Sequence, residues 1–276
     1  MKRILKRGTL YWSHVFISIL FLIPFLWSIS TSLKSPENVL LYPPQLIPKP
    51  ANWNNYAVLW SVGDGVFRIY FINSLVVAGI TVFLTLFVSS MAGYSFSKLW
   101  LRKYPFALLV LLTPLMVPFH SVLVPLFSLI NKLGLLDTRT ALVLIYSTFF
   151  LPFGVYMMKN SFDSIPDSII ESAKIDGCST FSIFLNIMLP LSLPGLAAVT
   201  VFTFLNSWNE FLISLIFTIS DNVKTLPVGL TMFLARYVVR WEMLNAGVVV
   251  SFIPVMLLFF LMQRYFVSGI ISGAAK

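Results

Sequence analysis

Cysteine and histidine are scarce in this sequence of 276 residues, which contains one cysteine, Cys178, and two histidines, His14 and His120. A single cysteine excludes an internal disulfide and a cysteine-rich metal site, and two histidines give no basis for a histidine metal cluster. Charged side chains are also few, at 11% of the residues, whereas a soluble domain has about 25%. Most of the surface therefore does not face water. Lipid is the simplest explanation for a chain that is 58% hydrophobic.

Catalytic and nucleotide-binding motifs are missing as well. No segment follows the G-x-x-x-x-G-K-[ST] pattern, so the chain cannot itself cradle the phosphates of ATP. No H-E-x-x-H motif and no pair of nucleophile and base can be identified. The net charge of +9 does not indicate nucleic-acid binding, because the basic residues are scattered over short segments between apolar runs. We therefore predict a membrane protein that is no enzyme, holds no metal and binds no nucleic acid.

Six apolar runs are long enough to cross a bilayer as helices, which takes about 20 residues each. The predicted spans are residues 11–29, 71–96, 105–130, 141–158, 193–219 and 244–266. They predict an all-α membrane protein with six transmembrane helices. A cleaved signal peptide is the alternative for the first run, but that run is long for one, and "SISTSLKSP" offers no convincing cleavage site.

Basic residues predict the orientation of these spans. The ones near the start are Lys2, Arg3, Lys6 and Arg7. They place the N-terminus in the cytoplasm, and an even number of spans returns the C-terminus to the same side. The hairpin with Lys98, Arg102 and Lys103 then also lies inside, which agrees. Residues 34–70 are expected outside, with "YPPQLIPKPANWNNY" (residues 42–56) as a proline-rich, extended connection, and residues 159–192 are expected inside.

The inner segment contains the stretch "ESAKIDGCSTFSIFLNIMLPLSLPG", which is broken by a glycine and more polar than its surroundings. The preceding letters, "SIPDSII", complete the pattern of a short helix that begins at Pro166 and stops at Gly177. Proline suits a first turn, and glycine suits a left-handed end. Asp167 and Lys174 at the two ends complement the helix dipole.

A second short helix is predicted to open at Ser179 or Thr180, with Asp176 bonding the free N–H groups at its start. Pro190 and Pro194 are predicted to end it before the fifth span. Apolar residues follow the helical period in both helices. The predicted buried positions are Ile165, Ile169 and Ala173 in the first helix, and Phe181, Phe184, Leu185 and Met188 in the second.

Two short amphipathic helices that meet at a glycine corner form a compact knob, which can fill a groove on another protein. The alternative is that both helices lie along the membrane interface, where helices are usually rich in Lys and Arg. The charged residues here are Asp163, Asp167, Glu171 and Asp176, against Lys159 and Lys174. Anionic lipid repels an acidic surface, so the composition favours docking on a protein.

The pattern Glu-x-Ala-x-x-Asp-Gly, followed further on by x-x-Leu-Pro, resembles the EAA loop of bacterial ABC importer permeases. The matching residues are Glu171, Ala173, Asp176, Gly177 and Pro190. Ser172 and Cys178 stand where the family usually has alanine, and both are small. In that family the loop is the coupling element, which is seated in a cleft of the ATP-binding subunit.

The resemblance extends over nearly the whole chain. The stretches that carry it are "TSLKSPENVLLYPP", "NWNNY", "LMVPFHSVLVPLFSLINKLGLLDT", "SWNEFL", "LPVGL" and "QRYFVSGIISGA". They look like carbohydrate importers of the maltose-permease class, and more narrowly like its second, MalG-like permease subunit. The resemblance implies a type I ABC importer permease fold with cytoplasmic coupling helices, in the bacterial cytoplasmic (inner) membrane.

Several further expectations come from this resemblance alone. The chain would comprise an N-terminal helix and outer loop (1–70), a five-helix core with the coupling loop (71–266, with 161–192) and a cytoplasmic tail (267–276). An ATP-binding subunit dimer would bind ATP and Mg, so this chain would bind no cofactor. The other partners would be a second homologous permease subunit, an extracellular solute-binding protein that contacts the loop 220–242, the sugar substrate and membrane lipid. The tail would reach the ATPase dimer interface.

Polar residues within the fifth span form a candidate substrate path, "FLNSWNEFL". Glu210 is the functional candidate, because a carboxylate at membrane depth is costly unless it is paired or faces a wet cavity. Asn206 and Glu210 are four residues apart on one helical face. With Asn209 and the ring of Trp208 they would supply the amide, carboxylate and aromatic groups that suit a sugar. The alternative is that Glu210 bonds a partner helix or lies near the headgroups.

Three other side chains have simpler interpretations. His120 lies among prolines in the third span, where a buried histidine that bonds a free carbonyl is the expectation. Trp241 and Tyr237 are expected to be interfacial anchors. Cys178 is expected to be a small apolar residue at the packed corner of the knob.

Two other functions compete with an importer subunit. A single-chain secondary transporter of a small polar solute would show internal repeats and intramembrane acid pairs, and neither is evident. An intramembrane enzyme would need a nucleophile and a base, and no such pair can be nominated.

Overall fold

In a computed structural model, residues 2–234 and 239–274 are described, with side chains for residues 11–234 and 239–265. The described chain consists of helices and connecting loops. It divides into two compact units. Unit 1 is Met1–Arg68 with Val228–Pro254, and unit 2 is Ile69–Pro227 with Val255–Lys276. The predicted all-α fold class is confirmed.

Unit 1 begins with α1 (Lys2–Ser32), which exposes apolar side chains along most of its described length, as a lipid-facing helix does. The end of α1 is fixed to the start of α2 (Asn54–Lys98) by one amide. Asn55 Nδ2 donates to the carbonyl oxygens of Ser32 and Lys34, each at 2.8 Å. This pair of bonds closes the connection between the first two long helices.

Helix α2 is interrupted near its start. Val62 to Gly65 have non-helical backbone, with a φ of +57° at Gly63 and +84° at Gly65. The predicted span 71–96 lies beyond this interruption. The expected extended connection over residues 42–56 is confirmed as non-helical up to Trp53 and is wrong for residues 54–56, because no proline follows Pro50 to stop a helix there.

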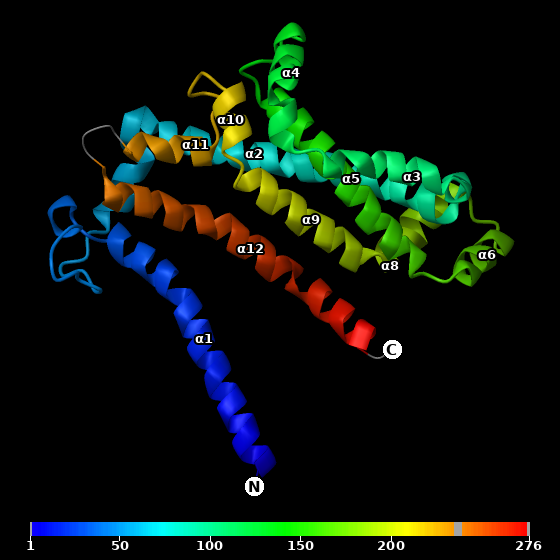
Figure 1. Cartoon of the computed structure of the whole chain (residues 1–276), viewed down its shortest axis with the longest axis horizontal. Helices are drawn as coiled ribbons and strands as arrows, with labels where there is room; N and C mark the ends of the chain where they lie inside the picture. Colours follow the sequence, from blue (N-terminus) through cyan, green and yellow to red (C-terminus); the bar gives the residue numbers. More distant parts are fainter. Residues whose placement is uncertain (1, 235–238, 275–276) are drawn as a thin grey trace. The chain divides into compact units, whose positions relative to one another are not determined.

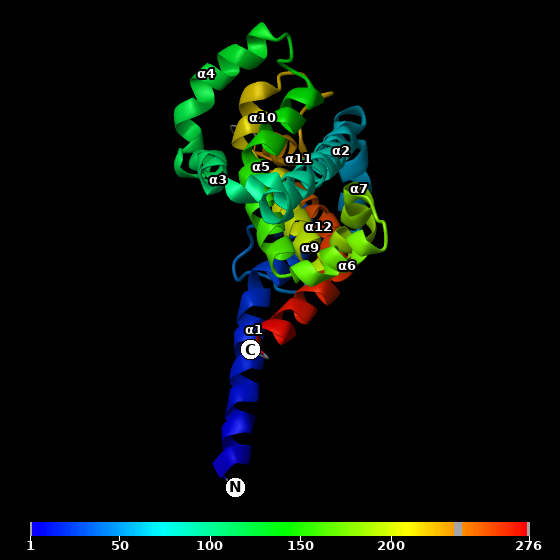
Figure 2. The same ribbon diagram turned by 90° about the vertical axis from the view of Figure 1, so that its right-hand side faces the viewer.

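Unit 2 is built around α5 (Arg139–Asp163), which contacts α3 (Pro105–Leu112), α9 (Leu193–Trp208) and α10 (Leu212–Phe217). Figures 1 and 2 show α9 running beside α5 in both views. One apolar cluster lies around Tyr146 of α5, and a second lies towards the other end of the same helix. The second cluster contains the buried residues of the knob.

Glycines allow the helix ends beneath the knob to approach closely. A Cβ at Gly93 of α2 would stand 2.8 Å from the backbone nitrogen of Lys159, and one at Gly195 of α9 would stand 2.6 Å from Cβ of Ser161. Carbon atoms at these separations repel strongly, so both positions require glycine as the structure stands. The backbones of α2 and α9 are therefore held tightly against the end of α5, from which the knob projects.

Four helices are long and apolar enough to cross a membrane. They are Tyr11–Ser32, Asn54–Lys98, Arg139–Asp163 and Trp241–Tyr265. Two further helix pairs pass the same test together, but they are bent by 94° and 75°. The bent pairs are Pro105–Met116 with Phe119–Lys132, and Thr180–Leu191 with Leu193–Trp208. The described residues thus contain six spans if each bent pair counts as one, and four otherwise.

A bend at Pro118 and a helix break after Trp208 correct the predicted third and fifth spans, whereas the 75° bend lies earlier, between Leu191 and Leu193. The third, expected to run unbroken over 105–130, turns at Pro118, whose extended backbone precedes α4 (Phe119–Lys132). The fifth, expected over 193–219, stops being helical at Trp208, and α10 begins only at Leu212. In both places the helix breaks inside a segment that was predicted as one span.

Candidate functional site

The first helix of the knob is α6 (Asp167–Ile175), within the predicted bounds. Pro166 precedes it with extended backbone, and Asp167 and Lys174 lie in its first and last turns. Its buried residues are Ile170 and Ala173. Ile169, predicted to be buried, is 37% exposed, because unit 2 packs against the neighbouring face of the helix.

The corner after α6 has the geometry of a Schellman motif. The N–H of Cys178 donates to the carbonyl of Ala173 at 2.9 Å, and the N–H of Gly177 donates to the carbonyl of Lys174 at 3.0 Å. The φ of Gly177 is +83°, in the left-handed region that only glycine enters without steric cost. The predicted positive φ at Gly177 is confirmed, and Cys178 packs against the second apolar cluster as expected.

The second helix begins at Thr180, as predicted, but its cap and its end differ from the prediction. Ser179 caps α7 (Thr180–Ile183), since its hydroxyl accepts from the N–H of Ser182 at 3.2 Å. The expectation that Asp176 caps this helix is therefore wrong, because a hydroxyl at the N-cap position already fills the role. Pro190 does not end the helix. It lies in the first turn of α8 (Leu189–Leu191), where proline's missing N–H costs nothing.

Between α7 and α8 the chain forms a π-helical turn, η4 (Phe184–Met188). This turn alters which apolar residues are buried, because each residue advances less around the axis than in an α-helix. Ile183, Phe184 and Met188 are buried, whereas Phe181 is 63% and Leu185 is 44% exposed. The predicted positions are thus right for Phe184 and Met188 and wrong for Phe181 and Leu185.

The residues that match the EAA pattern divide into an inner and an outer set. Ala173 is buried against the second apolar cluster. Glu171, Asp176, Gly177 and Pro190 are exposed. Ile175, at the end of α6, is 86% exposed. The corner therefore presents one apolar side chain beside the exposed Glu171, Lys174 and Asp176, on a backbone held from beneath.

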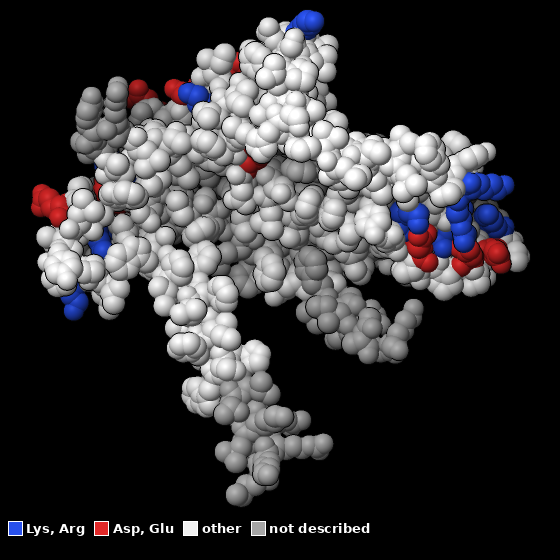
Figure 3. All heavy atoms as spheres, in the orientation of Figure 1, with Lys and Arg blue, Asp and Glu red and all other residues white. Residues whose placement is uncertain are grey.

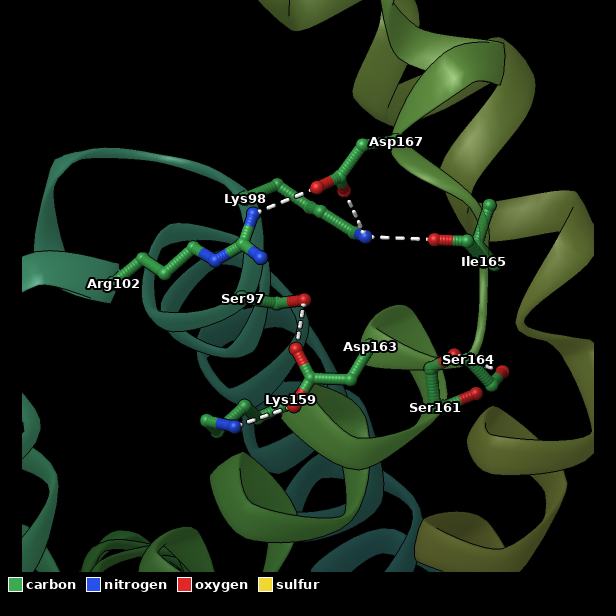
Figure 4. A network of polar contacts seen from close by, with 9 residues as sticks. All are labelled: Ser97, Lys98, Arg102, Lys159, Ser161, Asp163, Ser164, Ile165 and Asp167. Atoms are coloured by element: carbon green, nitrogen blue, oxygen red, sulfur yellow. Dashed lines mark hydrogen bonds and ion pairs between the residues drawn. The ribbon is translucent and has the colours of Figure 1, made fainter.

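A network of charges fixes the start of α6 to the hairpin that links α2 to α3. Figure 3 shows charged side chains gathered at the end of unit 2 that carries α6. Asp167 accepts from Lys98 Nζ at 2.6 Å and from Arg102 Nη1 at 2.8 Å. Lys98 also donates to the carbonyl of Ile165 at 2.7 Å, and its side chain is only 4% exposed. Figure 4 shows Lys98 reaching between these two acceptors.

A second carboxylate completes the network one turn earlier. Asp163, at the end of α5, accepts from the hydroxyl of Ser97 at 2.6 Å and pairs with Lys159 on the preceding turn (Figure 4). The sequence placed both the basic hairpin and the acidic segment on the same side of the membrane, but it gave no sign of which charge pairs with which. Complementary charge on two neighbouring segments was the available signal.

The pairing of Asp167 has a consequence for pH dependence. The hydrogen bond from Lys98, and then the one from Arg102, lower the pKa of Asp167 from 3.8 to about 2. A carboxylate whose pKa is lower in the folded state than in the unfolded state stabilises the fold at pH values above its unfolded pKa. This stabilisation is lost as the pH falls through the folded pKa. The attachment of α6 to the hairpin is therefore expected to stay constant from about pH 8 to about pH 4 and to weaken towards about pH 2.

The distance between spin labels at positions 103 and 174, in a Cys178→Ser background, measures this attachment. Its distribution should stay narrow above pH 4 and broaden below it, whereas Asp167→Asn should broaden it at every pH. A change in the wild-type distribution between neutral pH and pH 5 would contradict the assignment to Asp167.

Glu210 lies in the break between α9 and α10, and several donors satisfy its carboxylate. It accepts from the hydroxyl of Tyr146 at 2.8 Å, from the N–H of Ile213 at 2.9 and 3.0 Å and from the N–H of Ser214 at 3.1 Å. Glu210 therefore caps α10 and ties it to α5. This is the arrangement named as the alternative to a substrate contact.

The other candidate path residues do not converge with Glu210. Trp208 is 2% exposed, and its ring packs edge-on against Phe71 and stacks on Phe204. The ring thus has no face open to a sugar in this conformation. Asn206 and Asn209 are exposed, and their amides donate to the carbonyls of Phe202 and Leu205. The shared face predicted for Asn206 and Glu210 is lost because the helix ends between them.

Three further candidates are single residues. His120 is exposed in α4, so the expectation of a buried histidine is wrong. Trp241 is 40% exposed at the start of α12 (Trp241–Ala274), as an interfacial anchor would be. Tyr237 lies outside the described residues. The described residues contain no group of His, Cys, Asp and Glu that could hold a metal ion.

Apolar helices of membrane-spanning length and two bent pairs are the features of a multi-pass membrane protein. The chain belongs to the family of binding-protein-dependent transport system inner membrane components, whose family model matches residues 85–272.

Individual relatives agree with this assignment. The arabinooligosaccharides transport system permease protein AraQ of Bacillus subtilis is 35% identical over 94% of this chain and 92% of its own length. The sulfoquinovosyl glycerol transport system permease protein SmoH of Agrobacterium fabrum is 32% identical over 92% of this chain and 89% of its own. A chain of a bacterial ABC transporter that imports the acidic polysaccharide alginate has the same fold. Its TM-score is 0.80, over 94% of this chain and 97% of that one, at 22% identity.

Proposed function

We propose that this chain is one permease subunit of an ATP-driven importer that carries a sugar or oligosaccharide across the bacterial cytoplasmic membrane. Membership of the transport family supports the class. The names of the two relatives support the kind of substrate, because arabinooligosaccharides and sulfoquinovosyl glycerol are both built on sugars. Because these two substrates differ, we propose only that the substrate is built on a sugar, and we name no particular sugar.

The proposal places energy coupling in residues 161–192. The observation that carries it is the α6–α7 corner, where Gly177 at φ +83° ends one helix and the exposed Ile175 projects beside Asp176. An apolar side chain with an acidic rim on a rigid helical corner suits insertion into a groove of another protein. The α6–α7 corner would insert into a groove on a separate ATP-binding subunit. That subunit, as a dimer, would bind ATP and Mg.

The remaining partners follow from the same proposal. A second permease subunit would complete the pathway between the two chains, and a solute-binding protein would deliver the sugar at the outer loop 220–242. Within that loop, α11 (Leu226–Leu230) is a short helix with Leu226 and Val228 buried. The N-terminus, the C-terminal tail and residues 159–192 would all be cytoplasmic, as the basic N-terminus predicts.

A single-chain secondary transporter is the competing function. Ion-coupled transport uses intramembrane acids that exchange a proton or cation. Glu210 is engaged instead by a hydroxyl and two backbone N–H groups, as a helix cap is. This environment favours the importer subunit.

Purification of the tagged chain from its own host tests the proposal. An ATP-binding protein and a second permease are expected to co-purify. In proteoliposomes, this complex should hydrolyse ATP faster when the cognate binding protein and its oligosaccharide are added. Uptake by the chain alone, driven by an ion gradient and indifferent to ATP, would establish the secondary transporter instead.

A further inference from the structure

A cavity of about 490 Å³ lies beside the charge network, between the hairpin that follows α2 and the segment that joins α5 to α6. One wall is apolar and is formed by Leu101, Pro105 and Leu108. The cavity is also lined by the charged side chains of the network. A cavity lined by both apolar and charged side chains suits an amphiphile better than a small soluble ion.

The charged lining has more positive than negative charge. Lys98, Arg102 and Lys159 line the cavity together with Asp163 and Asp167. Lys159 pairs with Asp163, while Lys98 and Arg102 share the single charge of Asp167. One positive charge is therefore left uncompensated in this lining.

The uncompensated charge falls mainly on Arg102. Its side chain is 60% exposed, whereas that of Lys98 is 4% exposed and bonded to two oxygens. Only Nη1 of Arg102 bonds Asp167. A guanidinium presents five N–H donors in a planar fork that matches both carboxylate and phosphate, and phosphate is the one of these two groups that every phospholipid carries.

The cavity lies where the helices leave the apolar layer. Helix α2 ends at Lys98, and α5 ends at Asp163. Helix α3 starts at Pro105 and contains only apolar residues, "PFALLVLL". A headgroup at Arg102 would therefore lie at the membrane surface, with its acyl chain beside Leu101 and Leu108.

We propose that this cavity binds an anionic phospholipid of the inner leaflet, with the phosphate at Arg102 and an acyl chain along the apolar wall. Basic pockets between membrane helices on the cytoplasmic side bind such headgroups. Because Arg102 also bonds the first residue of α6, the lipid would lie against the joint that holds the α6–α7 corner. The proposal needs only the membrane orientation, so it can fail or succeed independently of the transport function.

The test compares phosphatidylglycerol with phosphatidylcholine. The purified full-length chain, with the partners that accompany it, is placed in phosphatidylcholine vesicles that contain a trace of either lipid with a spin label. The wild type should retain phosphatidylglycerol preferentially. Arg102→Gln should reduce this preference about fivefold, the effect of one basic residue at a membrane surface. Arg102→Lys should keep most of the preference, which excludes loss of the fold as the cause.

Two matched variants separate the cavity from general surface charge. Lys103→Gln removes the same charge from the next residue, which does not line the cavity, and should have a clearly smaller effect. Lys132→Gln, exposed at the end of α4, should have none. Equal losses in Arg102→Gln and Lys103→Gln, or no preference in the wild type, would overturn the proposal. Full displacement of the labelled lipid by inorganic phosphate would overturn the lipid assignment in favour of a plain anion site.

Discussion

Gly177→Val is expected to leave the chain inserted in the membrane but to abolish ATP-dependent uptake. A Cβ at this position meets no atom within 4 Å, so the effect is not a clash with a neighbour. It arises because φ is +83°, which costs an L-residue about 1–2 kcal/mol, and more when the side chain is β-branched. Relaxing that strain moves φ to negative values, breaks the bond from the N–H of Cys178 to Ala173 and swings α7 away from α6.

The loss should appear as dissociation of the ATP-binding subunit. If the strain is relieved in the free corner and must be restored for docking, the affinity falls roughly tenfold for each 1.4 kcal/mol. Co-purification and substrate-stimulated ATP hydrolysis both measure this. Gly177→Asn should retain more of each than Gly177→Val, because asparagine enters the left-handed region at lower cost.

Gly134 supplies a matched control. It follows α4 with a φ of +68°, a Cβ added there would also meet no atom within 4 Å, and its neighbour Leu135 donates to Ile130 as Cys178 does to Ala173. Gly134→Val should therefore cost similar stability without affecting the ATP-binding subunit. Equal loss of that subunit in both variants would mean that general destabilisation, and not the corner, is responsible. Normal uptake by Gly177→Val would show that α6 and α7 are an interfacial helix pair.

Local signals in the sequence are sufficient to predict where the first helix of the knob begins and ends. Pro166 and Gly177 mark its ends through properties of their own backbones, which depend little on the rest of the chain. The buried face depends on the partner surface, and for that reason Ile169 was assigned wrongly while Ala173 was right. Hydrophobic period identifies an apolar stripe, but it does not identify its centre when Ile169 and Ile170 are adjacent.

Breaks inside apolar runs could not be predicted from hydropathy. Residues 193–219 are apolar enough to be predicted as one span despite the polar residues at 206–210, yet the helix stops at Trp208, and Glu210 folds back onto the N–H groups of Ile213 and Ser214. The sequence offers Glu210 as a buried acid, and its role as a cap depends on the position of Tyr146 in another helix. The pairing of Lys98 with Asp167 is similar, since 69 residues separate the partners.

Glu210→Leu is the second substitution with a large expected effect. It removes the acceptor for two N–H groups at the start of α10, a loss of about 0.5–2 kcal/mol for a helix cap. It also leaves the hydroxyl of the fully buried Tyr146 without this acceptor, at about 1–3 kcal/mol for a buried polar group. Helix α10 should then fray and lose its fixed position against α5, while the four long apolar helices still insert.

The kinetic consequence separates a positioning role from direct contact with the sugar. If Glu210 acts by holding α10, uptake by Glu210→Leu should fall mainly in maximal rate. Tyr146→Phe removes one of the hydrogen bonds to Glu210, so its maximal rate of uptake should also fall, but by less than that of Glu210→Leu. Glu210→Gln keeps an oxygen acceptor for the cap, so its maximal rate of uptake should lie between those of the wild type and Glu210→Leu. A raised KM for uptake in Glu210→Gln, with an unchanged maximal rate and normal uptake by Tyr146→Phe, would instead establish that Glu210 binds the sugar. Wild-type uptake by Glu210→Leu would contradict both roles, because neither the cap nor a sugar contact survives that substitution.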